Sequence, residues 1–462
     1  MPRPSDQILT VAQMREAEEA LIAAGTSVDA LMQIAGRGAA EWVWRLGWPR
    51  PVTVLCGPGN NGGDGYVIAE TLRARGLPVT VVAPLAPATD AARNARGHYR
   101  GEVLASADGV RGTVLVDCLF GSGLVRPLGQ ELFDMLRGLA DSHPLRVAID
   151  LPSGVESDSG HPLNEGLPDY RLTVSLGAWK YAHWTMPAAA LMGERRLVSI
   201  GVAEVPGAAR LLAKPRLHPP AADAHKYTRG LLAIVPGAMP GASLLASEAA
   251  MQGGAGYVRL AAAQAPMGTP PDLVVDPQAL ADPRLSAALA GPGLGRGEDA
   301  QRVLGEVLAR EVPTVLDADA LVALTPAMLA GRRAPLIATP HEGELTRLAV
   351  SFGIAAQGKR AVAQELARRT GMVVIAKGAD SLIAAPDGRM ALARPAPSWL
   401  SVAGTGDVLA GLVASRLATG ADPFAAACEA VWLHGEAARL AGPVLTPSAL
   451  VTHIAAAYAA CL

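Results

Sequence analysis

Short apolar runs alternate with helical stretches through almost the whole chain, and this alternation limits the possible folds more than any other feature. Strands that alternate with helices pack into a mostly parallel sheet with helices on both faces. Half of the 462 residues are hydrophobic and only 18% are charged, which suits sheets that are buried on both faces. The apolar runs expected as strands span residues 52–56, 79–83, 113–116, 146–149, 172–176, 196–200, 231–235, 257–261, 273–275, 314–316, 336–338 and 372–376.

The alternation is interrupted once, by a proline-rich stretch near the middle of the chain. Residues 214–222 hold three prolines and no hydrophobic period, which is typical of a linker. A chain of 462 residues is also too long for one ordinary core. We therefore expect an α/β protein with two three-layer α/β/α domains, at residues 1–213 and 223–462.

Composition argues against two classes of partner. The formal net charge is −2 and aromatic residues make up 4% of the chain, so neither a basic surface nor stacking side chains favour nucleic acid. The longest uncharged run, residues 440–462, is interrupted by Pro443 and Pro447, so we expect a turn and a terminal helix rather than a membrane span. Four cysteines without C-x-x-C spacing are typical of a reducing compartment, and we expect a cytoplasmic location.

A glycine pair opens a long apolar helix in the second half of the chain. Gly404 and Gly406 flank Thr405, and the helix is expected over residues 408–417. Free backbone N–H groups at such a helix start attract an anion, and glycine lets a phosphate approach the backbone closely. Asp407 follows at once and would act as a base that takes a proton from an attacking hydroxyl. A capping role for Asp407 is the alternative.

A glycine-rich segment, GPGNNGGDG at residues 57–65, lies between an expected strand and a helix expected over residues 66–75. It contains the G-x-G-x-x-G spacing of dinucleotide-binding loops, but no acid ends the next strand to hold a ribose. The missing acid argues against an ordinary hydride-transfer function. Asn60, Asn61 and Asp64 add polar groups that a plain phosphate loop does not need.

Two more polar clusters follow strands of the first half, at residues 117–127 and 150–155. Ligands bind at the carboxyl ends of parallel strands, where Asn61, Asp117 and Ser153 are expected. One carboxylate among neutral oxygen donors suits a weakly charged cation better than zinc. Turn and capping roles are the alternative for each of the three residues.

The segments GPGNNGGDG, DCLFGSGLVRP and AIDLPSGVESDSG resemble the epimerase domain of the NAD(P)H-hydrate repair enzymes, over residues 8–205. The resemblance implies a Rossmann-like fold that interconverts the R and S forms of hydrated NADH or NADPH. It also implies a potassium ion held by Asn61, Asp117 and Ser153, and Asp150 as the acid/base group. The implied substrate contacts are Asn60, Asn61, Gly62, Gly63, Asp64, Gly121, Ser122, Gly123, Leu124, Val125, Arg126, Pro127 and Asp150.

The second half, over residues 223–460, resembles the ADP-dependent NAD(P)H-hydrate dehydratase domain, which has a ribokinase-like fold. Besides the glycine pair, the matching segments include GPGLG at 291–295, TPHEGE at 339–344 and KGAD at 377–380. The resemblance implies that the S form is dehydrated with ADP and magnesium, giving AMP and phosphate. The implied hydrate contacts are Ala242, Gly293, His341 and Asp407, and the implied nucleotide contacts are Lys377, Gly378, Ala379, Asp380, Ser381, Gly404, Thr405 and Gly406.

Four further side chains have roles that follow from their positions in the second half. Lys377 ends an expected strand and would meet a nucleotide phosphate, or is a solvated lysine at a turn. His341 begins an expected helix, where the helix dipole favours its neutral form, and would hydrogen-bond a substrate. Asp317 and Asp319 would place magnesium or the substrate, or cap a helix.

One residue and two segments depart from the family patterns, and one phosphate-binding motif lacks the structural context that it requires. Gln33 stands where this family usually has a glutamate, and residues 236–240 and 397–401 replace the usual loops near the expected ligands. Residues 353–360 fit G-x-x-x-x-G-K, but an arginine follows the lysine and no strand precedes the motif. We therefore expect a loop and a helix start there rather than a triphosphate site.

A second function remains open from the sequence. A vitamin or sugar kinase fused to a non-catalytic nucleotide- or protein-binding domain is the alternative, because the glycine pair occurs across ribokinase-like kinases. Such a kinase would release a stable phosphorylated product, and it leaves the motifs of the first half without a role. We expect small-molecule partners and a homo-oligomer, with no nucleic acid and no membrane.

Overall fold

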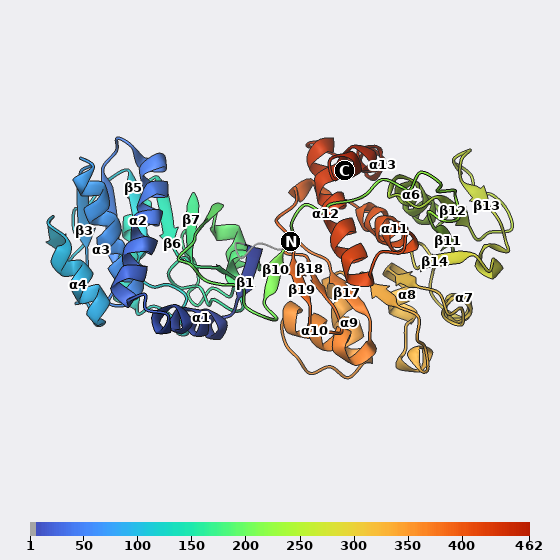
Figure 1. Ribbon diagram of the computed structural model, residues 1–462, viewed down its shortest axis with the longest axis horizontal. Helices are drawn as coiled ribbons and strands as arrows, with labels where there is room; N and C mark the ends of the chain where they lie inside the picture. The colour runs from blue at the N-terminus through green and yellow to red at the C-terminus, as the bar shows by residue number, and fades with distance from the viewer. Residues whose placement is uncertain (1–5) are drawn as a thin grey trace. The chain divides into compact units, whose positions relative to one another are not determined.

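The computed structural model describes residues 6–462, and the chain divides into two compact units with the boundary between Arg210 and Leu211 (Figure 1). Each unit contains a mostly parallel sheet with helices on both faces, so the expected α/β class with two three-layer domains is confirmed. The bounds of the linker, 214–222, stay a prediction.

Seven parallel strands form the main sheet of the first unit. In spatial order they are β4 (Val103–Leu104), β3 (Val79–Val82), β2 (Val52–Cys56), β5 (Val114–Cys118), β6 (Leu145–Ile149), β7 (Leu172–Leu176) and β9 (Glu194–Val198). A separate short pairing joins β1 (Gln7–Leu9) to β8 (Trp179–Lys180) and β10 (Ala209–Leu211). Because the main strands are parallel, their carboxyl ends share one edge, where the polar clusters follow.

Helices cover both faces of this sheet. On one face lie α2 (Val28–Gly47), α3 (Asn60–Ala74) and α4 (Asp90–His98), with Met14 of α1 (Val11–Ala23) in the same core. The other face is covered by α5 (Gln130–Asp141). Val54 and Leu55 of β2 belong to the two different cores, as the alternation of side chains along a strand requires.

The second unit has a longer sheet whose last two strands reverse direction. Its spatial order is β13 (Val274–Val275), β12 (Tyr257–Leu260), β11 (Leu231–Val235), β14 (Leu285–Ala290), β15 (Thr314–Leu316), β16 (Leu336–Ala338), β17 (Val373–Ala376), β18 (Leu382–Ala384) and β19 (Met390–Leu392). The pairs are parallel as far as β17, and β17, β18 and β19 are antiparallel.

Two groups of helices sandwich this second sheet. One face is covered by α6 (Pro240–Gln252), α11 (Thr405–Ala418), α12 (Pro423–Ala441), α13 (Pro447–Thr452) and α14 (Ile454–Ala459). The opposite face carries α7 (Glu298–Leu308), α8 (Ala318–Ala323), α9 (Glu342–Ser351) and α10 (Lys359–Thr370). The terminal helix expected near residue 447 is confirmed, because Thr446 caps α13 by accepting from the N–H of Ala449.

The glycine-rich segment of the first unit is more helical than expected. The helix predicted from residue 66 begins at Asn60, so the polar residues lie in the first turns of α3 rather than in a loop. A Cβ at Gly62 would lie 1.8 Å from the carbonyl oxygen of Gly57, and one at Gly65 would lie 2.7 Å from the Cys56 sulfur. The glycines therefore allow α3 to pack directly against the strand ends. In the sequence the same glycines resemble a turn, so the early start of the helix is not predicted.

A strand in the middle of the second sheet is absent from the sequence prediction. β14 pairs with β11 on one side and β15 on the other, so it is central and fully hydrogen-bonded. Its sequence, LSAALA, lacks the β-branched and aromatic residues that mark strands. Small side chains suit a strand that is crossed closely by helix α11, and this tertiary reason is invisible in the sequence.

Residues 212–222, which include the expected linker at 214–222, contain neither helix nor strand. One of them packs into the second unit, because Leu217 is buried and its N–H donates to the carbonyl oxygen of Cys461 at 2.9 Å.

The four cysteines are unpaired. Across residues 6–462, none of the helices combines the length and the apolar character that crossing a membrane requires.

Candidate active sites

The carboxyl ends of β2, β5 and β6 bring together the polar residues expected in the first unit. Asn61 lies in the first turn of α3 after β2, Asp117 lies within β5, and Asp150 follows β6. The loop after β5 reaches the same place, since a Cβ at Gly121 would lie 3.0 Å from Asp150 Oδ2 and 3.3 Å from Asn61 Cγ. The side chain of Asp150 therefore faces this shared edge.

Asp150 pairs with a lysine that the sequence analysis does not identify. Lys180 Nζ lies 2.5 Å from Asp150 Oδ1 and also donates to the carbonyl oxygen of Leu176 at 2.6 Å. The backbone N–H of Ser122 donates to Asp150 Oδ2 at 3.0 Å. Burial alone would raise the pKa of Asp150, but the Lys180 ammonium holds that pKa below its ordinary value. The result is a buried carboxylate–ammonium pair, which is suited to proton transfer.

Two more carboxyl groups lie in the electrostatic reach of this pair. Burial raises the pKa of Asp64 well above its ordinary value, and the negative charges of Asp150 and Glu18 raise it further. Burial also raises the pKa of Glu18 on α1. Both shifts favour the neutral acid, and a neutral carboxyl group can donate a hydrogen bond to a ligand.

The three residues expected to hold a cation differ in how many hydrogen bonds their side chains already make within the protein. Asp117 is fully buried and accepts from Ser153 Oγ at 2.6 Å and from the hydroxyl of Tyr170 at 2.6 Å. The N–H of Ser153 donates to Asp117 Oδ2 at 3.0 Å, the same oxygen that accepts from Tyr170. In contrast, both side-chain polar atoms of Asn61 are buried and have no hydrogen-bond partner among residues 6–462.

The remaining residues expected to contact substrate in the first unit are spread around this centre. Asn60 accepts from Thr89 Oγ1 at 2.7 Å. Gly62 and Gly63 are buried against Gly57 and Met32, so they serve close packing of α3. The loop beyond Ser122 is exposed or half-buried at Gly123, Leu124, Val125, Arg126 and Pro127.

In the second unit, Asp407 stands in the first turn of α11, directly after the glycine pair. Gly404 has a φ of 97°, a left-handed conformation that favours glycine, and a Cβ there would lie 2.9 Å from Pro447 Cγ. Burial raises the pKa of Asp407 to about 6, and the charges of Asp317 and Asp319 add to this while Lys377 opposes it. A carboxylate with this pKa is a stronger base than an ordinary aspartate and is still ionised at neutral pH.

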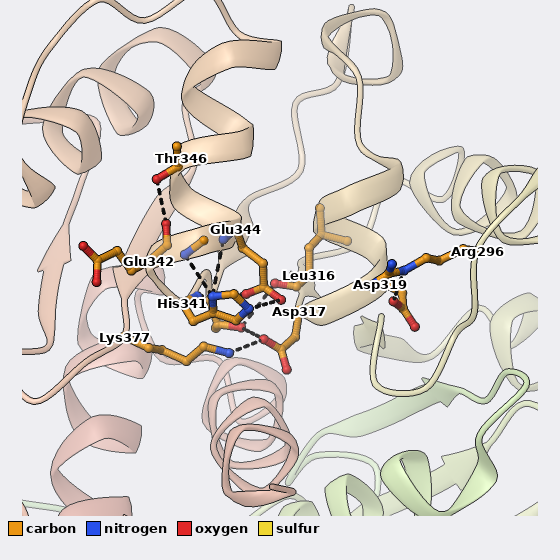
Figure 2. A network of polar contacts seen from close by, with 11 residues as sticks. Arg296, Leu316, Asp317, Asp319, His341, Glu342, Glu344, Thr346 and Lys377 are labelled. Atoms are coloured by element: carbon orange, nitrogen blue, oxygen red, sulfur yellow. Dashed lines mark hydrogen bonds and ion pairs between the residues drawn. The ribbon is translucent and has the colours of Figure 1, made fainter. Parts of the chain in front are cut away.

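Lys377 is held by the buried acid Asp317 (Figure 2). Its Nζ donates to Asp317 Oδ1 at 2.7 Å, and a Cβ at Gly406 would lie 3.5 Å from the same Nζ. Thr339 Oγ1 also donates to Asp317 Oδ1, at 2.5 Å. Asp317 occupies the capping position of α8 but makes no capping hydrogen bond, so its carboxylate orients Lys377 instead.

His341 caps α9, as its expected position at a helix start suggests (Figure 2). Its Nδ1 accepts from the N–H groups of Gly343 at 3.0 Å and Glu344 at 3.4 Å, and Glu344 Oε2 accepts from the N–H of His341 at 2.8 Å. Since Nδ1 accepts, the proton of the neutral ring resides on Nε2. Nε2 lies 3.4 Å from Glu344 Oε1, so the ring faces this carboxylate, and 62% of the His341 side chain is exposed to solvent.

The other expected hydrate contacts lie where α6 begins. Met239, just before α6, donates its N–H to the carbonyl oxygen of Gly293 at 3.0 Å, which brings Gly293 to the first turn that contains Ala242. Gly293 has a φ of 65°, and a Cβ there would lie 2.2 Å from the carbonyl oxygen of Met239. Asp319 Oδ2 accepts from the N–H of Gly295 at 3.0 Å, so Asp319 shapes the same loop.

The segment Lys377–Gly378–Ala379–Asp380–Ser381 forms a compact turn after β17. Ser381 Oγ accepts from the N–H of Gly378 at 3.0 Å and donates to the carbonyl oxygen of Gly378 at 2.8 Å. The expected helix start at the failed phosphate motif is confirmed, because α10 begins at Lys359. Unexpectedly, Lys359 Nζ donates to Asp380 Oδ1 at 2.6 Å, so this lysine supports the turn.

The chain is an α/β enzyme of two compact units, with a buried carboxylate–ammonium pair in the first and a carboxylate after a glycine pair at a helix start in the second. A relative from Salinibacter ruber, called bifunctional NAD(P)H-hydrate repair enzyme Nnr, is 35% identical over 510 residues and aligns with 96% of this chain and 94% of its own. A relative with the same name from Gloeobacter violaceus is 34% identical, with 93% and 92% aligned. The chain belongs to the family of bifunctional NAD(P)H-hydrate repair enzymes.

Models of the two component domain families match separate parts of the chain. Residues 232–458 match the family described as NAD(P)H-hydrate dehydratase, and residues 28–182 match the family described as YjeF-related protein N-terminus. Among solved structures, ADP/ATP-dependent NAD(P)H-hydrate dehydratase from Bacillus subtilis, co-crystallised with ATP and Mg²⁺, is 29% identical over 54% of this chain and 95% of its own, with a TM-score of 0.46. Yeast ynu0 is 24% identical over 38% of this chain and 82% of its own, with a TM-score of 0.35.

Proposed function

We propose that the chain repairs hydrated NADH and NADPH by two successive activities. The first unit epimerises the R and S forms of the hydrate, and the second dehydrates the S form with ADP as phosphoryl donor. The observation that carries this proposal is the pairing of a buried Asp150–Lys180 site with an Asp407 site at a glycine-rich helix start. The full-length relatives named for this repair support it.

Epimerisation at a hydroxyl-bearing carbon requires the C–O bond to break and then to form again on the other face. The departing hydroxyl must receive a proton, and the returning water must lose one. The Lys180 ammonium can donate a proton and the Asp150 carboxylate can accept one. Because the two groups lie 2.5 Å apart, one proton can move between them during the reaction. The carboxyl group of Asp64 would hold the substrate.

Dehydration begins when the hydroxyl of the hydrate attacks the β-phosphorus of ADP. Asp407 takes the hydroxyl proton, the bond from the β-phosphorus to the bridging oxygen breaks, and AMP leaves. The N–H groups at Gly404 to Gly406 and the Lys377 ammonium offset the negative charge that develops on the phosphoryl oxygens. The phosphorylated carbon then loses phosphate, a neighbouring carbon loses a proton, and the double bond of the nicotinamide ring is restored.

The nucleotide would sit on the turn after β17, with Lys377, Gly378, Ala379, Asp380 and Ser381 around its α-phosphate and ribose. Asp407 and the glycine pair fix the position of the transferred phosphorus. With ADP that phosphorus is the β-phosphorus, one phosphate closer to the adenosine than in ATP. The only match to a triphosphate motif, residues 353–360, ends at the start of α10, which supports ADP as donor.

A potassium ion would be held by Asn61, Asp117 and Ser153. The buried side-chain oxygen of Asn61 has no hydrogen-bond partner in residues 6–462, which is the observation that favours a bound cation. An amide, a hydroxyl and one carboxylate provide the oxygen donors that a monovalent cation accepts. When bound, the ion would fix Asn61 beside the loop that faces Asp150.

Magnesium would arrive with ADP rather than occupy a site made by the protein alone. Within residues 6–462, no group of three or more His, Cys, Asp or Glu side chains is arranged to hold a metal ion. Mg²⁺ commonly binds through one or two carboxylates together with phosphates of the nucleotide. Asp319 is the candidate carboxylate, because its contact with Arg296 Nε, at 3.4 Å, is longer than the 2.7 Å contact between Asp317 and Lys377 Nζ.

The test is to incubate the whole chain with a mixture of R and S hydrated NADH, without nucleotide, with ADP, and with ATP. Without nucleotide, a sample enriched in the R form should return to the mixture. With ADP, both forms should become NADH, with one AMP and one phosphate for each hydrate consumed. Accumulation of a stable phosphorylated product would support the kinase alternative, and faster consumption of ATP with inert ADP would overturn the donor assignment.

We also propose that the enzyme acts in the cytoplasm as a homo-oligomer on small-molecule substrates. The unpaired cysteines and the nucleotide substrates support a reducing compartment. Light scattering of the purified chain would measure its mass in solution. A monomer over the working concentration range would contradict the oligomer.

A further inference from the structure

A single buried imidazole contacts both members of the proton-transfer pair. His183 ends the short turn η2 (Tyr181–His183) and is fully buried. Its Nε2 lies 2.7 Å from the carbonyl oxygen of Asp150, and its Nδ1 accepts from the N–H of Lys180 at 2.9 Å. Since Nδ1 accepts, the ring proton sits on Nε2 and is donated to Asp150. Burial and the Lys180 charge lower the pKa of His183 to about 4, so the ring stays neutral.

The backbone of Asp150 needs this support because of its conformation. Asp150 has a φ of 64°, in the left-handed region that side chains other than glycine rarely adopt. Its N–H is fixed by the carbonyl oxygen of Val174 at 2.8 Å, which leaves its own carbonyl to be held by His183. Such conformations persist only where the surrounding contacts enforce them, and they cluster at functional sites.

We propose that His183 is a positioning residue for epimerisation, because it fixes the backbones of Asp150 and Lys180 at once and so sets how their side chains face each other. The inference rests on the proposed epimerase function of Asp150. The ring of Trp179 meets His183 edge-on with a centroid distance of 5.5 Å and packs on Trp184 at 5.0 Å. These aromatic rings hold the imidazole in place.

The first test compares His183→Phe with His183→Gln in the epimerisation assay. Phenylalanine leaves the Asp150 carbonyl and the Lys180 N–H without partners, so kcat should fall about 10- to 100-fold while KM changes less than about twofold. Glutamine can donate an amide proton to Asp150, so it should restore most of kcat. Equal kcat in His183→Phe and the unmodified enzyme would overturn the inference.

The matched control is His143, the other fully buried histidine of the first unit with both ring nitrogens bonded. Its Nε2 contacts Thr53 Oγ1 at 2.8 Å and its Nδ1 contacts the carbonyl oxygen of Leu139 at 2.7 Å. His143→Gln should lower the unfolding temperature without changing kcat of the folded enzyme. A loss of kcat in His143→Gln as large as the loss in His183→Phe would indicate a general structural effect and contradict the proposal.

The decisive readout combines His183→Phe with Asp150→Asn. If His183 acts through Asp150, the double variant should be no slower than Asp150→Asn alone, whereas a general structural effect would multiply the two losses. If the phenylalanine variant does not fold, the same cycle is measured with His183→Ala, which also leaves the Asp150 carbonyl and the Lys180 N–H without a side-chain partner. An unmodified rate in Asp150→Asn would overturn the proposed function and this inference with it. Multiplied losses beside a slow Asp150→Asn would overturn only the role of His183.

Discussion

Asp407 combines partial burial with a nearby lysine, and its pKa of about 6 sets a pH dependence for dehydration. The base must be ionised, so the rate should be nearly constant above pH 7 and fall about tenfold per unit below the pKa. Initial rates of NADH formation from the S hydrate between pH 5 and pH 8, with saturating ADP, measure this. A rate that rises as the pH falls below 6 would show that Asp407 is not the base.

Replacing Asp407 with asparagine keeps the shape of the side chain but removes the proton acceptor. We expect Asp407→Asn to slow dehydration about 10²–10⁴-fold and to leave epimerisation unchanged. Asp150→Asn should do the reverse, and each variant is the control for the other in the same two assays. Near-normal dehydration by Asp407→Asn would move the base to Asp317, which contacts Lys377 and Thr339, or to Asp319, which contacts Arg296.

Lys359 gives a prediction that only the structure supplies. It begins α10, where the helix dipole disfavours a positive charge, and the Asp380 carboxylate at 2.6 Å compensates for this. A Cβ at Gly378 would lie 2.5 Å from Lys359 Nζ, so the lysine lies against the proposed nucleotide turn. We expect Lys359→Met to raise KM for ADP about 5- to 20-fold, the range of roughly 1–2 kcal/mol.

The control for Lys359→Met is Lys359→Arg, which keeps the charge and should keep most of the ADP affinity. Calorimetric titration with ADP separates binding from turnover, and epimerisation should be unchanged in both variants. Unchanged ADP affinity in Lys359→Met, together with a folded second unit, would show that the ion pair does not support the nucleotide turn.

The sequence could predict the candidate acids but not their partners. Asp150 directly follows an expected strand and Asp407 directly follows a glycine pair, and such local patterns are visible in one sequence. Lys180 and His183 contact Asp150 from about 30 residues further along the chain, and no local pattern encodes such contacts. One signal was present: Lys180 is a charged residue in the otherwise apolar stretch that continues from β7, and buried lysines need a partner.

At the scale of elements, residue periodicity predicts most strands and helices because parallel strands are nearly continuous apolar runs. It fails where packing overrides local preference. β14 is an alanine-rich strand, and the start of α3 is a glycine-rich helix. In both places the small residues let another element approach closely. The larger side chains whose periodicity would mark a strand or a helix in the sequence are therefore missing.

The crossing of α11 and α6 offers a stability test of this close packing. A Cβ at Gly411 in α11 would lie 2.1 Å from the carbonyl oxygen of Ala246 in α6, so Gly411→Ala forces the helices apart. We expect a loss of about 1–3 kcal/mol in the free energy of unfolding of the second unit. Chemical denaturation followed by circular dichroism measures it.

The matched control is Gly305, which lies inside α7 with nothing within 4 Å of an added Cβ. Gly305→Ala should stabilise the same unit by about 0.5–1 kcal/mol, because alanine has the higher helix propensity. If both substitutions change stability equally, the close crossing of α11 and α6 does not require glycine.

At the scale of the whole molecule, each unit contains a mostly parallel sheet, its covering helices and one candidate site. The repeated strand–helix alternation predicts this organisation from the sequence. The exact boundary is harder to predict, because residues without secondary structure can still pack. Leu217 illustrates this, since it lies in the expected linker but is buried against the second unit.

The last prediction is that the two activities can be separated by cutting the chain between the units. Residues 1–213 should fold and epimerise without nucleotide, and residues 214–462 should fold and dehydrate only the S hydrate with ADP. A shorter second piece, residues 221–462, lacks Leu217 and its hydrogen bond to Cys461, so it should be less stable by about 1.5–3 kcal/mol. Mixing the two longer pieces should restore complete conversion of both R and S hydrate. If neither longer piece folds while the whole chain does, the boundary is wrong, and if residues 214–462 alone consume the R form, epimerisation does not belong to the first unit.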